Sequence, residues 1–113
     1  MRRWAANGGS ARLAALAGQE HAILAALRAH DVYGAFDHCQ PLQESIEHAQ
    51  EARPIPAGPV NDRWQNALAR LATATTRCLN GVGHGDHTDL ARARVLGAAG
   101  LARLLAVRRA LAH

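Results

Sequence analysis

The sequence predicts an all-α protein that folds as an up-down-up-down four-helix bundle. Hydrophobic residues make up 49% of the chain but aromatic residues only 4%, and 26 of the 113 residues are alanine. Alanine and leucine lead the helix-propensity scale, whereas the β-branched and aromatic residues that favour strands are scarce. Apolar residues also recur at three- and four-residue intervals. A chain of this length is expected to form one domain, 1–113, around one core.

The first helix is expected to follow a flexible lead, residues 1–9. Asn-Gly-Gly at positions 7–9 breaks any earlier helix, and Ser10 is a suitable N-cap. The helix should then span about residues 11–29. Its apolar stripe consists of Leu13, Leu16, Ile23, Leu24 and Leu27.

Glu20 falls inside that apolar stripe. A carboxylate there is costly unless it is paired, so we expect Glu20 to meet an arginine or to lie at the edge of the stripe. The alternative is a functional buried acid. Glu20 would then be the one candidate acid of an enzyme with a pocket between its helices.

The second helix is expected to run from its N-cap, Asp31, to about Arg53. Pro41 lies inside it and removes a backbone hydrogen bond, so the helix should kink there or break and restart. Three prolines make residues 53–60 a linker between the second and third helices. The apolar stripe of the second helix consists of Phe36, Cys39, Leu42, Ile46 and Ala49.

The third helix has the most regular seam in the chain, with residues spaced four and three apart from Trp64 to Val82, all of them apolar except Thr75. It is expected to span about residues 60–79 and to stop at Asn80-Gly81, a typical left-handed helix end. We expect the other helices to pack against this seam.

The fourth helix is expected to begin after a cap at Asp86 or Thr88 and to continue to the C-terminus. Gly97 and Gly100 interrupt it, and a mid-helix glycine costs roughly 1 kcal/mol relative to alanine. The two glycines should therefore permit a close helix crossing, or present a small-residue face for self-association. The leucine stripe of this helix consists of Leu90, Leu96, Leu101, Leu104 and Leu111.

The two cysteines are predicted to face each other. The second and third helices must be antiparallel because the linker is short, and symmetric pairing about the linker places Cys39 opposite Cys78. A disulfide would close a loop of about 40 residues, worth on the order of 4 kcal/mol, and would persist outside the cytosol. The alternatives are reduced core thiols, or a metal or redox role, although the chain has no Cys-x-x-Cys.

Histidines gather at one end of the predicted bundle, because the first and third turns of an up-down bundle lie together. Candidate metal ligands there are His30, His84, Asp86 and His87, with Asp31 beside them. Imidazole and carboxylate suit Zn, Ni or Cu. Their spacing matches no established ligand pattern, and a solvated polar end is the competing interpretation.

Charge is unevenly distributed in this chain, which has a net charge of +4 and 13 basic residues, all arginine. Acidic residues concentrate in 31–53 and arginines in 86–113, and we expect these two helices to neutralise each other. The arginines of the fourth helix are scattered around it, so no nucleic-acid interface is predicted. We find no signal-peptide pattern and no transmembrane segment, which predicts a soluble, cytoplasmic protein, or an extracytoplasmic one if the cysteines are paired.

Five short motifs carry a resemblance to a family. They are His30-Asp31, Cys39-Gln-Pro-Leu42, Pro54-Ile-Pro56, Trp64-Gln-Asn-Ala-Leu68 and Cys78-Leu-Asn-Gly81. In this order they resemble small uncharacterised helical proteins common in actinobacteria, which are often secreted or lipid-anchored. The resemblance covers roughly residues 20–105 and implies a paired Cys39 and Cys78, but no activity. The chain departs from the family by showing no export signal.

These observations favour a non-enzymatic bundle protein that acts through a protein partner or by self-association. The alternative is a metal-binding or redox protein that uses the histidine-rich end or the cysteine pair, with a transition metal as its cofactor. The sequence points to no small-molecule ligand.

Overall fold

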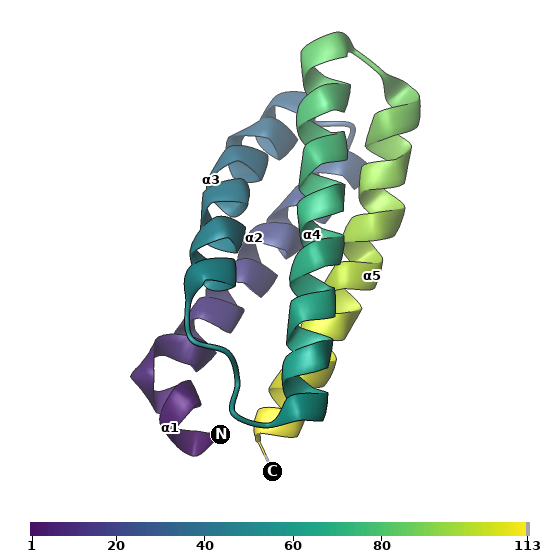
Figure 1. Ribbon diagram of the computed structural model, residues 1–113. Helices are drawn as coiled ribbons and strands as arrows, with labels where there is room; N and C mark the ends of the chain where they lie inside the picture. Colours follow the sequence, from purple (N-terminus) through teal and green to yellow (C-terminus); the bar gives the residue numbers. More distant parts are fainter. Residues whose placement is uncertain (113) are drawn as a thin grey trace.

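Four long helices pack into an elongated antiparallel bundle (Figure 1), which confirms the predicted fold class. The structure is a computed structural model that describes residues 1–112. It measures 43 × 19 × 18 Å along its principal axes. The helices are α2 (Ser10–Arg28), α3 (Val32–Glu51), α4 (Gly58–His84) and α5 (His87–Leu111), preceded by the short helical segments α1 (Arg2–Trp4) and η1 (Ala5–Gly9).

The four helices form a closed ring in which each packs on two neighbours. The α4–α5 pair is the most extensive, and α2–α3, α3–α4 and α2–α5 complete the ring. The acidic helix α3 and the arginine-rich helix α5 therefore occupy opposite corners. The expectation that these two helices neutralise each other is wrong: within residues 1–112 the one ion pair joins Arg77 of α4 to Asp89 of α5, at 2.9 Å.

The core follows the predicted stripes of α2, α3 and α4. All five predicted α2 positions are buried, as is the α4 seam from Trp64 to Cys78. On α3, Ala35 takes the buried place expected for Phe36, which is only half-buried. For α2, α3 and α4, the apolar stripes predicted from the 3.6-residue helical period thus locate the buried residues to within one position.

The buried face of helix α5 differs from the predicted leucine stripe. It is formed mainly by small residues, and only one of the predicted leucines, Leu104, belongs to it. A Cβ at Gly100 would lie 2.9 Å from Leu71 Cδ2 of α4, and a Cβ at Gly97 would overlap the carboxyl of Glu20 on α2. This confirms the close helix crossing. Both glycines are buried inside the bundle, so the proposed self-association face around them is wrong. The buried α5 residues are Ala93, Gly97, Gly100, Leu104 and Val107.

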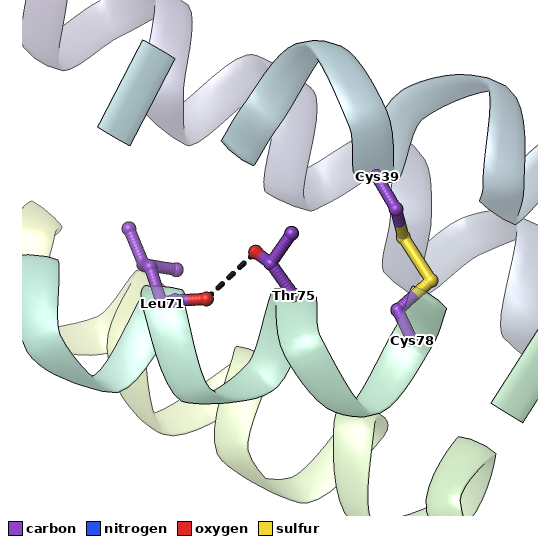
Figure 2. The surroundings of a disulfide bond; sticks show 4 residues. All are labelled: Cys39, Leu71, Thr75 and Cys78. Atoms are coloured by element: carbon purple, nitrogen blue, oxygen red, sulfur yellow. Dashed lines mark hydrogen bonds between the residues drawn. A yellow bond between two sulfur atoms is a disulfide. The ribbon is translucent and has the colours of Figure 1, made fainter. Parts of the chain in front are cut away.

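The predicted cysteine pair is a disulfide between α3 and α4 (Figure 2). The two sulfur atoms lie 2.02 Å apart, and the side chains are 0% and 1% exposed at Cys39 and Cys78. One turn away, buried Thr75 donates its hydroxyl to the Leu71 carbonyl oxygen at 2.7 Å, which satisfies the one hydroxyl group in the seam (Figure 2). The linker joins α3 to α4 at one end, and the disulfide joins them near the other.

The N-terminal residues form helical turns where a flexible lead was expected. Asn7 and Gly8 do interrupt the helix, since Gly8 adopts φ +106°. The chain before them nevertheless folds back, and the Trp4 ring packs edge-on against Trp64 with centroids 5.5 Å apart. Ser10 has helical backbone angles and makes no cap hydrogen bond, so its predicted role as N-cap is wrong.

Helix α4 continues past its predicted stop. Gly81 remains helical and buried, because α5 packs so closely there that a Cβ would lie 2.8 Å from the Leu90 side chain. Gly85 adopts the left-handed conformation instead, at φ 63°. The same helix begins at Gly58, which shortens the expected linker 53–60.

Helix α3 continues through Pro41, so the predicted break is wrong. Pro41 and Asp37, whose carbonyl loses its hydrogen bond, are both exposed, and water can hydrate that carbonyl. Within residues 1–112, none of the helices is long and apolar enough to cross a membrane.

Candidate functional site: a basic groove between α2 and α5

The corner between α2 and α3 holds a histidine in a strained backbone conformation. His30 N–H donates to Leu27 O at 3.2 Å and Asp31 N–H donates to Ala26 O at 2.8 Å, the two bonds of a Schellman motif. The motif places His30 in the left-handed region, at φ 56°. Glycine adopts this conformation without penalty, so His30 is retained here at an energetic cost.

The three aspartates at this end of the bundle are all engaged within the fold. Asp31 caps α3 by accepting from Gly34 N–H at 2.9 Å, and Asp86 caps α5 by accepting from two backbone N–H groups at 2.9 and 3.4 Å. Asp89 pairs with Arg77. Both predicted caps are therefore confirmed, and within residues 1–112 Asp89 is the one of these three carboxylates that forms an ion pair.

Two adjoining hollows form a groove between α2 and α5, which we call the α2–α5 groove. Their volumes are about 400 and 310 Å³. They share Ala91 and Arg94, so they form one continuous surface. The first is lined by Leu24, Arg28, Ala91, Arg94, Val95 and Ala98, and the second by Leu27, His30, Val32, His87, Leu90, Ala91 and Arg94.

The groove combines apolar walls with basic side chains. Its titratable lining residues are Arg28, His30, His87 and Arg94, and no carboxylate of residues 1–112 lines it. None of these four takes part in an ion pair within the described chain. Val95 at its edge is 70% exposed, an unusual exposure for a large apolar side chain. The groove can therefore accept a ligand that has both apolar and anionic groups.

The predicted metal ligands are only partly brought together. His30 and His87 line the same hollow, but His84 and Asp86 do not line it, and Asp86 is occupied as a helix cap. Among residues 1–112 there is no group of three or more histidine, cysteine or acidic side chains placed to hold a metal ion. The corner thus supplies two imidazoles without the carboxylates that the metal hypothesis required.

Glu20 lies beneath the groove, in the α2–α5 interface. It is 2% exposed, and burial raises the pKa of its carboxyl from 4.5 to about 8, so the group is neutral at pH 7. Its Oε1 lies against Gly97, and no basic side chain of residues 1–112 pairs with it. The expectation that Glu20 meets an arginine or lies at the edge of its stripe is wrong. It lines neither hollow of the groove, so it does not have the position of a catalytic acid there.

Sequence reasoning missed the α2 and α5 residues that shape the groove. One signal was available. Val95 follows Arg94 and lies two residues from buried Ala93, and this spacing places Val95 on the outer side of α5. An apolar residue beside an arginine on an outer face is typical of an interaction surface.

No protein-family model, curated protein or solved structure matches this chain. Its function must therefore be inferred from the geometry of the molecule, and the resemblance to actinobacterial helical proteins stays a prediction.

Proposed function

We propose that this protein binds an acidic, amphipathic helical segment of a partner protein in the α2–α5 groove. The observation that carries the proposal is the lining itself, apolar along both helices and exclusively basic among its titratable groups. An amphipathic helix presents apolar side chains at positions i, i+3 or i+4, and i+7 along one face. Those side chains would pack on Leu24 and Val95, and flanking carboxylates would meet Arg28 and Arg94.

The surroundings of the groove support a pre-organised site. Both walls are long helices within the closed ring, so little order has to be gained on binding. The left-handed His30 is a local strain of the kind that accumulates at functional positions. The Cys39–Cys78 disulfide favours an oxidising compartment as the place where the partner is met.

The test uses two synthetic helical peptides with the same leucine pattern, one flanked by glutamates and the other by lysines. Each is titrated into isotopically labelled protein, and backbone amide shifts are followed by NMR. We expect saturable binding of the acidic peptide, with shifts concentrated around Ala91 and Val95 and an affinity that falls as salt is added. Equal binding of the lysine peptide would contradict the proposal.

Charge-reversal variants locate the binding surface. Arg28→Glu and Arg94→Glu should each weaken binding of the acidic peptide by about tenfold. Arg92→Glu and Arg103→Glu are matched controls, because both arginines are exposed on α5 and line neither hollow. An equal loss in the control pair would show that net charge, and not the groove, determines binding.

Two other occupants would be recognised by the same measurements. Concentration-dependent shifts in the groove without peptide, together with a dimer in sedimentation velocity, would identify a second copy of this chain as the ligand. Duplex DNA that binds more tightly than the acidic peptide would overturn the proposal.

A further inference from the structure

The N-terminal turns lie beside the linker between α3 and α4 at the opposite end of the bundle from the α2–α5 groove (Figure 1). The residues of these two segments line a further hollow. Its volume is about 380 Å³, within the usual range of roughly 300–1,000 Å³ for small-molecule sites. Three arginines and an indole contribute to its lining, together with linker prolines. The residues that matter here are Arg3, Trp4, Arg12, Arg53, Pro54 and Pro56.

The indole of Trp4 is held in place from three sides. Its Nε1–H donates to the Arg53 carbonyl oxygen at 2.9 Å, and its ring meets Trp64 edge-on at an interplanar angle of 78°. Its face lies so close to Gly9 that a Cβ there would overlap the ring. The aromatic wall of this hollow is therefore fixed before any ligand arrives.

The three arginines that line the hollow come from separate segments of the chain. Arg3 belongs to α1, Arg12 to the first turns of α2, and Arg53 to the linker. No acidic residue of the described chain lines the hollow, and none of the three arginines forms an ion pair within residues 1–112. Like charges gathered around one hollow repel one another, and an anion between them would relieve that repulsion.

We propose that this hollow, which we call the arginine pocket, binds a small organic anion. A phosphate or carboxylate group would accept hydrogen bonds from the guanidinium groups of Arg3, Arg12 and Arg53, whose planar forks match both anions. A flat apolar part of the ligand would lie against Trp4 and the linker prolines. The pocket is at the other end of the molecule from the α2–α5 groove, so this proposal does not depend on the proposed function.

The test follows the combined fluorescence of Trp4 and Trp64 and the heats of binding while phenyl phosphate, benzoate or inorganic phosphate is added. We expect phenyl phosphate to bind about tenfold more tightly than inorganic phosphate, because only the former has a ring to pack on the indole. Comparing benzoate with phenyl phosphate separates the carboxylate from the phosphate as the preferred group. The absence of saturable binding by all three probes up to about 10 mM would overturn the proposal.

Variants separate the pocket from general positive charge. Arg12→Gln and Arg53→Gln should each weaken phenyl phosphate binding by about tenfold, whereas Arg92→Gln, with its side chain exposed on α5, should leave it unchanged. Equal losses in all three variants would contradict a specific site.

A glycine pair tests the indole wall. Gly9→Ala should displace Trp4 and weaken binding of phenyl phosphate more than that of inorganic phosphate. Gly18→Ala, where no atom lies within 4 Å of the added Cβ, is the control and should change neither affinity. Loss of affinity in the control alone, or unchanged binding in Gly9→Ala, would refute the role of the indole. Circular dichroism of each variant verifies that the helices remain folded.

Discussion

Replacing Glu20 by glutamine should remove a large pH dependence of stability. Burial raises the pKa of the folded carboxyl to about 8, against 4.5 for the exposed group. Between these values the native state keeps a proton that the unfolded chain releases, so the free energy of unfolding falls as pH rises and levels off above pH 8. The slope within this window is about 1.4 kcal/mol per pH unit, and the total is roughly 3–5 kcal/mol.

Glutamine is a close mimic of the protonated carboxyl and cannot ionise. At pH 5, Glu20→Gln should therefore match the wild-type protein to within about 1 kcal/mol, the difference reflecting the extra amide donor. At pH 9 the variant should be more stable by several kcal/mol, because only the wild-type protein then holds a buried carboxylate or must take up a proton to fold.

The assay is urea unfolding at pH 5, 7 and 9 without reductant, so that the disulfide stays intact. Any other pH-dependent contribution to stability is shared by both proteins and cancels in the difference. Glu47→Gln, at an exposed position of α3, is the control and should follow the wild-type curve. Parallel curves for wild-type and Glu20→Gln protein would refute a buried, unpaired acid.

Three further predictions concern the backbone and the cross-link. Cys39→Ala with Cys78→Ala should lower the free energy of unfolding by about 4 kcal/mol, and the unreduced wild-type protein should show no reactive thiol after denaturation. Gly97→Ala should destabilise the protein by about 1–3 kcal/mol in urea unfolding, because the new Cβ overlaps the buried carboxyl of Glu20. The control Gly18→Ala should stabilise the protein by up to about 1 kcal/mol. The opposite order of stabilities would contradict the close approach of α2 and α5. His30→Gly should raise the unfolding free energy by about 1 kcal/mol and the melting temperature with it, and an unchanged melting temperature would argue against strain at this turn.

The sequence was sufficient to place the two cysteines opposite each other, because helix phase and the short linker together determine their register. The α4 seam and the α3 stripe each follow the 3.6-residue period, and a short linker forces the two helices to be antiparallel. These constraints place Cys39 opposite Cys78 without any knowledge of α2 or α5. The α2 stripe was likewise correct, including the position of Glu20 inside it.

Features set by contacts between distant segments were not accessible to the same reasoning. Asn80-Gly81 has the local pattern of a helix end, but packing of α5 on Gly81 favours continuation and Gly85 provides the left-handed residue one turn later. Similarly, the sequence at positions 7–9 indicates an interruption. It does not indicate that Trp4 returns to pack on Trp64.

The charge imbalance behind both proposed sites also depends on tertiary structure. Four of the nine acids have a defined structural role: Glu20 is buried in the core, Asp31 and Asp86 cap helices, and Asp89 forms an ion pair. Of the remaining five, only Asp62 lies outside α3. The other four are Asp37, Glu44, Glu47 and Glu51.

Because α3 lies at the opposite corner of the ring from α5, its carboxylates do not neutralise the arginines that line the α2–α5 groove. The net charge of +4 is therefore unevenly distributed, and no acidic residue of the described chain lines the groove or the arginine pocket. Anionic ligands suit both sites because their linings are basic, and added salt should weaken both kinds of binding. The pH dependence caused by Glu20 should persist in salt, because a desolvated carboxyl is shielded from mobile ions and its pKa is raised by burial, not by surface charge.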